Sequence, residues 1–136
     1  FVQAKEDNHF KVTVEQLEAA RTDKTKVLVL NSPSNPTGMI YSREELMAIG
    51  NWAVAHDVLI LADDIYGRLV YNGNEFVPIS SLSEAIRKQT IVINGVSKAY
   101  AMTGWRVGYA VGNPAIIAAM SKLTGQTTSN LTAVSQ

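Results

Sequence analysis

Three short runs of aliphatic and β-branched residues divide the chain, and a polar cluster follows each of them. Residues 26–30 (KVLVL), 58–62 (VLILA) and 90–94 (TIVIN) are almost continuously apolar, which is typical of fully buried strands in a parallel sheet. Residues 105–111 (WRVGYAV) predict a fourth strand. About ten residues separate it from Asn94, and a parallel crossover needs a dozen or more. We therefore expect this strand to be antiparallel to the third or to lie elsewhere in the sheet.

Helical periodicity occurs between these runs. Residues 14–21 (VEQLEAAR) predict a short amphipathic helix. Ser42 begins a longer helix as Ser-Arg-Glu-Glu, a capping box that places Glu45 at the third helical position. The apolar face of that helix is formed by Leu46, Ile49, Trp52 and Ala53. Pro114 begins an apolar helix at a favoured first-turn position. Strands joined by helices and long links predict an α/β fold, a three-layer α/β/α arrangement with a mostly parallel sheet.

Composition narrows the class of protein. The 136 residues are enough for one domain and are 46% hydrophobic and 18% charged. Twelve basic residues balance twelve acidic ones, which argues against a nucleic-acid or anionic-membrane partner. The absence of cysteine excludes disulfides and thiolate metal sites. No apolar run approaches the roughly 20 residues of a membrane helix, so a cytoplasmic location is expected. His9 and His56 lack a partner at ligand spacing, and no metal is expected.

The two ends of the chain indicate a segment of a longer protein. Phe1 is not a start methionine, and residues 129–136 are polar and carry no helix stop signal. Trimmed or disordered termini are the alternative. Composition does not decide between these interpretations, but the motifs at the strand ends favour a segment.

The polar clusters lie where a parallel sheet binds ligands. They occupy residues 31–38, 63–66 and 95–98, each just after an apolar run, and ligands bind beyond the carboxyl ends of parallel strands. We expect one crevice to contain an amine, an acid, a phenol, an amide and a guanidinium, contributed by Lys98, Asp63, Tyr66, Asn35 and Arg106.

The three clusters resemble, in order, the signatures of class I and II aminotransferases. These are NSPSNPTG at residues 31–38, ADDIY at 62–66 and NGVSKAYAMTGWRVGY at 94–109. The resemblance extends from about Lys26 to about Met120. It implies a pyridoxal 5'-phosphate enzyme of the aspartate aminotransferase kind, with residues 1–136 forming part of the large, cofactor-binding domain and the small domain absent.

The resemblance assigns the central role to Lys98. The matching lysine forms the Schiff base with the cofactor aldehyde and then moves a proton between the substrate and the cofactor. A neutral, desolvated amine is needed for this chemistry. A solvated loop lysine is the plain alternative, and the flanking motif argues against it.

The resemblance also places the other cofactor contacts. Asp63, rather than its neighbour Asp64, should be a buried carboxylate that keeps the pyridine nitrogen protonated. Tyr66 and Asn35 should bind the cofactor's phenolic oxygen, and Asn35 the substrate carboxylate as well. Asn35 precedes a proline, so a cis bond is a candidate there. Each residue also has a purely structural interpretation: Asp63 as an acid in a turn, Tyr66 as a half-buried aromatic at the rim, and Asn35 as an ordinary turn residue.

Arg106 should bind the cofactor phosphate with its planar fork of donors. Ser97 is a further candidate contact for the cofactor. Many relatives carry a hydroxyl residue three positions before the lysine, where this chain has Gly95, and that departure puts the usual serine–phosphate contact in doubt.

Amino-group transfer between an amino acid and a 2-oxo acid is the leading function. The resemblance favours aspartate and 2-oxoglutarate as the substrates. The family builds its site at a dimer interface, so a homodimer is expected for the full-length protein. The ring-stacking aromatic, the phosphate-binding helix start and the carboxylate-clamping arginine lie outside this sequence, so we expect the isolated chain to be inactive. The alternatives are a same-fold C–S lyase or aminocyclopropane-carboxylate synthase relative, a sensor domain of a transcription regulator, and a cofactor-free packing module.

Overall fold

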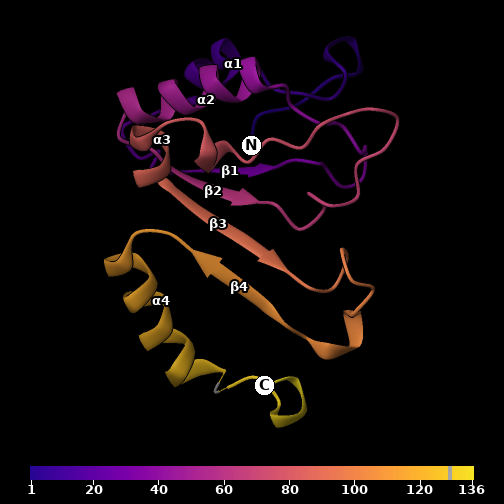
Figure 1. Ribbon diagram of the computed structural model, residues 1–136. Helices are drawn as coiled ribbons and strands as arrows, with labels where there is room; N and C mark the ends of the chain where they lie inside the picture. The colour runs from indigo at the N-terminus through magenta and orange to yellow at the C-terminus, as the bar shows by residue number, and fades with distance from the viewer. Residues whose placement is uncertain (129) are drawn as a thin grey trace.

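The computed structural model describes residues 1–128 and 130–136. Ser129, the first residue of the polar C-terminal stretch, lies outside the described residues. Four strands form one sheet in the order β1-β2-β3-β4 (Figure 1). Their bounds are Val27–Asn31 for β1, Leu59–Asp63 for β2, Thr90–Gly95 for β3 and Gly108–Val111 for β4. The first three are parallel and β4 is antiparallel to β3, which confirms the mixed, mostly parallel sheet.

The fourth strand begins later than the sequence pattern predicts. Residues Thr103–Trp105 form a 3-10 turn, η3, instead of extended chain. Arg106, which follows it, has a left-handed backbone with φ 56° and ψ 41°. An extended strand cannot pass through that conformation, so regular pairing starts only at Gly108.

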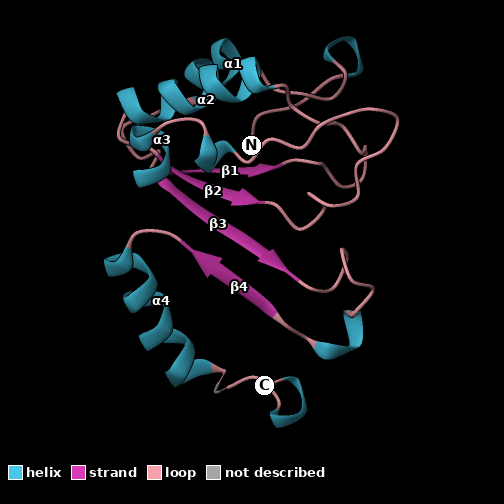
Figure 2. Cartoon of the chain, in the orientation of Figure 1, coloured by secondary structure: helices cyan, strands magenta, loops and turns pink. Residues whose placement is uncertain are grey.

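Three of the four α-helices begin where the sequence predicts, at Val14, Arg43 and Pro114. Helix α1 is Val14–Ala20, α2 is Arg43–Ala55, α3 is Glu84–Lys88 and α4 is Pro114–Thr127 (Figure 2). At α2 the Ser42 hydroxyl accepts from the Glu45 N–H, and the Glu45 carboxylate accepts from the Ser42 N–H at 2.6 Å. This is the predicted capping box. Helix α3 is a finding of the structure; the Ser83 hydroxyl caps it by accepting from the Ile86 N–H.

Helices α1, α2 and α3 cover one face of the sheet, and their side chains form the core. Alternate residues of β1 and β2 point into it, and α2 contributes its predicted apolar face. The main contributors are Leu30, Ile60, Ala62, Leu46, Ile49, Trp52, Ala53 and Ile86. Burying a Leu or Ile side chain in this core is worth about 2 kcal/mol, and this layer fixes the position of the strand ends.

The opposite face of the sheet is largely open. Val27 is 49% exposed and Val29 is 66% exposed, so the prediction of a fully buried strand at residues 26–30 is wrong for this face. Helix α4 supplies the third layer only beside β4, where its Ile117 and Met120 face Ala110 across a cavity. In Figure 1 it lies apart from α1 and α2, at the far edge of the sheet.

Three further 3-10 turns complete the chain, at Glu6–Asn8, Ile79–Ser81 and Ala133–Ser135. Among the described helices, none has both the length and the apolar character needed to cross a membrane.

Candidate active site at the strand ends

Parallel pairing brings the predicted polar clusters to one edge of the sheet. Asn31, the last residue of β1, pairs with Asp63, the last residue of β2. Asp63 in turn pairs with Ile93 of β3. That strand ends at Gly95, and Lys98 follows three residues later in a turn. The strands that precede the three predicted polar clusters therefore end at the same edge of the sheet.

The Asn35 and Tyr66 side chains are hydrogen-bonded to each other. The Asn35 Nδ2 donates to the Tyr66 hydroxyl at 3.2 Å, although the two residues are far apart in the chain. The Asn35–Pro36 peptide bond is cis, as predicted, and so is Ser32–Pro33. The pair presents a phenol and an amide together, an arrangement suited to binding one oxygen of a ligand.

Lys98 lies beside this pair. Its Nζ is 5.7 Å from the centroid of the Tyr66 ring, within the range of a cation–π contact. No carboxylate lies within ion-pairing distance of Lys98 in the part of the chain that the structure describes. The side chain is exposed, so the desolvation that a Schiff-base lysine needs is not provided by residues of this chain.

Asp63 is half-buried, whereas the sequence predicted a buried carboxylate. It alternates with Ala62 and so lies on the open face of the sheet, away from the helices. Its Oδ1 accepts from the Ile65 N–H at 3.1 Å. The rest of the carboxylate receives no hydrogen bond from the described residues and is available to a ligand.

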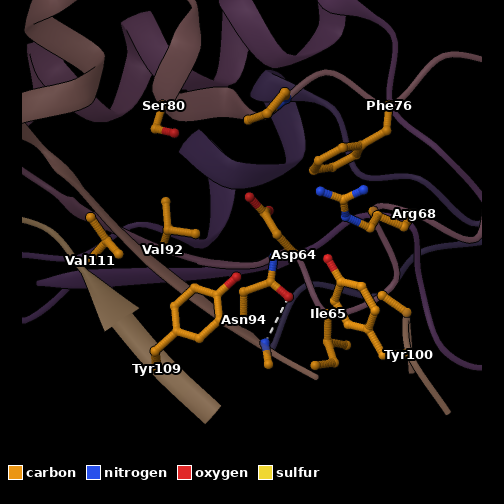
Figure 3. A pocket seen from close by; sticks show the side chains of 14 residues that line it. Asp64, Ile65, Arg68, Phe76, Ser80, Val92, Asn94, Tyr100, Tyr109 and Val111 are labelled. Atoms are coloured by element: carbon orange, nitrogen blue, oxygen red, sulfur yellow. Dashed lines mark hydrogen bonds between the residues drawn. The ribbon is translucent and has the colours of Figure 1, made fainter. Parts of the chain in front are cut away.

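Asp64, the neighbour that the motif set aside, is the buried acid. It is 7% exposed and lies on the helix-covered side, next to Asn94 and Tyr109 (Figure 3). Burial, together with the negative charge of Asp63, raises the pKa of the Asp64 carboxyl to about 7. Sequence reasoning missed this because the alternation of β2 had to be known before the two acids could be assigned to opposite sides.

Ser97 and Arg106 are near this edge in sequence but make no hydrogen bond or ion pair with the other predicted residues. Ser97 is half-buried and Arg106 is exposed. The Arg106 guanidinium donates to the Thr103 carbonyl at 2.9 Å. A left-handed backbone on a residue with a side chain costs about 1 kcal/mol or more, and such strain is concentrated at functional positions.

Two cavities flank this cluster, and Lys98 lines neither of them. One, of about 520 Å³, is lined by Asp64, Arg68, Tyr100 and Tyr109 (Figure 3). The other, of about 640 Å³, separates β4 from α4 and includes Arg106. Within residues 1–128 and 130–136, no group of three or more His, Asp or Glu side chains could hold a metal ion.

Gly95, the departure from the family pattern, has a local explanation. It pairs with Gly108 across β3 and β4. A Cβ at Gly95 would lie 2.8 Å from the Val107 carbonyl oxygen and 3.2 Å from the Ile65 Cδ1. The close approach of β4 leaves no room there for the hydroxyl residue that many relatives carry.

Comparison with known families accounts for the whole chain. The family model described as aminotransferase class I and II matches residues 1–136. The chain belongs to the class I and II aminotransferase family. The resemblance inferred from the strand-end motifs is thereby confirmed.

Two relatives with transaminase names are similar in sequence. The asparagine–oxo-acid transaminase of Streptococcus mutans serotype c is 74% identical over all 136 residues. The aspartate aminotransferase of Bacillus subtilis is 52% identical over the same span. The chain covers 35% of the length of each of these relatives.

Solved structures of aminotransferases show the same fold. An aromatic aminotransferase from Pyrococcus horikoshii superposes with a TM-score of 0.94 at 34% identity, over 98% of this chain and 36% of that one. The aspartate aminotransferase from Rhizobium meliloti superposes with a TM-score of 0.92 at 42% identity, over 96% of this chain and 33% of that one.

Proposed function

We propose that this chain is the core of the large domain of a pyridoxal 5'-phosphate-dependent aminotransferase and that Lys98 carries the cofactor. The observation that supports this best is the convergence of Lys98, Tyr66 and Asn35 at the strand ends, joined by a hydrogen bond and an aromatic contact. Family membership supports the reaction class. The transaminase names of the reported relatives favour amino-group transfer over the lyase and regulator alternatives.

The residues present fit the cofactor chemically. Bound pyridoxal phosphate supplies an aldehyde for covalent attachment and a pyridine ring that accepts electrons. Lys98 offers an amine that no described acid neutralises, and Asp63 offers a free carboxylate oxygen for the ring nitrogen. The Tyr66 hydroxyl and Asn35 amide would hold the phenolic oxygen, and Arg106 would hold the phosphate. The Ser97 hydroxyl would be a further contact of the cofactor.

Lys98 would also carry the proton transfer. If neutral and shielded from water, its amine would take a proton from the substrate's α-carbon and deliver it to the cofactor carbon on the other side of the amino nitrogen. The exposure of Lys98 in this chain means that the shielding must come from parent segments outside residues 1–136. We therefore propose that the isolated chain does not turn over substrate.

The substrate and assembly are proposed from the relatives. The named activities of the two relatives point to a small acidic or amide amino acid, so asparagine stands beside aspartate as the amino donor, with a 2-oxo acid as acceptor. A homodimer in the cytoplasm is proposed for the full-length protein.

Reductive trapping tests the proposal. Full-length protein is mixed with pyridoxal phosphate, reduced with borohydride, digested and mapped by mass spectrometry. We expect a single adduct on Lys98, absent in Lys98→Ala, while Lys88→Ala serves as the control because Lys88 is an exposed helix residue paired with Glu84. No adduct, or labelling spread over surface lysines, would refute the cofactor role.

The reaction is tested on the same protein without an acceptor. Addition of asparagine or aspartate should leave the cofactor in its amine form and release one equivalent of the 2-oxo acid. S-methylcysteine is added in a separate reaction, and release of pyruvate, ammonia and methanethiol together from it would support the C–S lyase alternative instead. The ratio of the two initial rates would show which donor the enzyme prefers.

A further inference from the structure

Asn31 connects two loops that carry candidate cofactor residues. Its Nδ2 donates to the Asp63 carbonyl oxygen at 3.1 Å. Its Oδ1 accepts from the backbone N–H of Asn35 at 2.9 Å. One carboxamide therefore joins the end of β2 to the loop that follows β1, and it uses both its donor and its acceptor to do so.

These bonds close a ring of interactions around the site. The Asn31 carboxamide joins the Asp63 carbonyl to the Asn35 backbone N–H. The Asn35 side chain then donates to the Tyr66 hydroxyl at 3.2 Å. Tyr66 leads back to Asp63 through a turn in which the Ile65 N–H binds the Asp63 carboxylate. Lys98 lies against the Tyr66 ring. The relative positions of Asp63, Asn35 and Tyr66 thus depend on Asn31, a residue that has no assigned role.

The position of Asn31 explains why an amide is required. It is the last residue of β1 and lies directly opposite Asp63 in the parallel register, so its side chain can reach across the strand ends. The loop from Asn31 to Asn35 has few other ties to β2, and Asn35 itself is exposed. An aspartate in its place would keep the acceptor but would set a negative oxygen against the Asp63 carbonyl. An aliphatic residue would lose both bonds.

We propose that Asn31 is a positioning residue of the cofactor site: it holds the Asn35 amide and the Tyr66 hydroxyl at a fixed place relative to Asp63. It touches neither cofactor nor substrate and acts through Asn35. This inference rests on the proposed function, because its consequence is measured on bound pyridoxal phosphate.

The test compares Asn31→Asp and Asn31→Leu with Asn113→Ala in the full-length protein. Asn113 is a matched control, since its Oδ1 caps α4 by accepting from the Ala115 N–H at 2.9 Å, away from the strand-end site. Pyridoxal phosphate affinity is titrated by fluorescence, and the pH at which the visible band of the bound cofactor shifts is recorded. Melting temperatures of the cofactor-free proteins report any general destabilisation.

Both Asn31 variants should bind pyridoxal phosphate about tenfold more weakly, which is the effect of losing one or two ordinary hydrogen bonds. The pH of the spectral shift should rise, because the Tyr66–Asn35 pair would hold the phenolic oxygen less well. Asn113→Ala should change neither reading. A purely structural role for Asn31 would lower the melting temperature and leave the spectral pH unchanged, which would overturn the inference.

The outcomes separate this inference from the proposed function. If wild type is labelled on Lys98 and both Asn31 variants match Asn113→Ala, the positioning role fails and the proposed function stands. If wild type takes up no cofactor on Lys98, the proposed function fails, and the positioning role fails with it. Asn31→Asp preserves the size and polarity of the side chain, so a folded variant is available if Asn31→Leu does not fold.

Discussion

Replacing Asp64 with asparagine should make the chain more stable at neutral and alkaline pH. Asp64 is 7% exposed and faces the cavity with Tyr109 and Asn94. Burial, and then the charge of Asp63, raises the pKa of its carboxyl from 3.8 to about 7. A group that binds its proton more tightly when folded stabilises the folded state at low pH. That stabilisation is complete below pH 3.8 and is lost as the pH rises through about 7.

The magnitude follows from the pKa change. Each pKa unit corresponds to about 1.4 kcal/mol, so the change from 3.8 to about 7 corresponds to at most about 4 kcal/mol. The carboxyl faces a cavity that solvent can enter and screen, and we expect about 2 kcal/mol. Asparagine has nearly the same shape and never ionises, so Asp64→Asn should gain this amount at pH 8 and nothing at pH 4.

Urea unfolding followed by circular dichroism, repeated between pH 4 and pH 8, measures the effect. The free energies of unfolding of wild type and Asp64→Asn should coincide at the acid end and diverge as the pH rises. Asp57→Asn is the control, because Asp57 is an exposed acid in the turn after α2. Parallel curves for wild type and Asp64→Asn would show that Asp64 ionises without penalty, and the assignment of the buried acid would be wrong.

Three glycine or alanine positions give further predictions, each measured by urea unfolding. Ala101 has a left-handed φ of 53° and is exposed, so Ala101→Gly should stabilise the chain by about 1 kcal/mol; a loss of stability would contradict the backbone argument. At Gly50 a Cβ would lie 2.5 Å from the Cδ1 of the fully buried Ile86, and Gly50→Ala should cost about 2 kcal/mol despite its better helix propensity. At Gly95 the Cβ would lie 2.8 Å from the Val107 carbonyl oxygen, and Gly95→Ser should cost about 2 kcal/mol; an unchanged midpoint would show that β4 can move away.

Local signals in the sequence were sufficient for most of the fold. The capping box at Ser42 and the proline at residue 114 placed the starts of α2 and α4, because a cap acts within one turn of the chain. The short distance between β3 and β4 argued against a parallel crossover, and of the two arrangements left open the structure shows antiparallel pairing with β3. Helix α3 was missed because a five-residue helix has too few turns to show a period.

Tertiary contacts decided what local signals could not. The apolar sequence of residues 26–30 fits a strand that is covered on both faces equally well as a strand whose Val29 side chain is exposed. The ring through Asn31 was also beyond the sequence, because it depends on the register that sets Asn31 opposite Asp63. The predicted site residues themselves came from motif order, and the structure adds contacts for Asn35, Tyr66 and Lys98 but none for Ser97.

Gly95 links the fold of this chain to the way it would hold a phosphate. The close pairing of Gly95 with Gly108 removes the hydroxyl that many relatives place three residues before the lysine. Strand β4 begins two residues after Arg106, and the left-handed backbone of Arg106 directs the chain into that strand. The β3–β4 junction of this chain therefore leaves no side-chain hydroxyl at residue 95. The phosphate would then depend more heavily on Arg106, and Arg106→Lys, which keeps the charge but loses the planar fork, should weaken cofactor binding more than it does in serine-containing relatives.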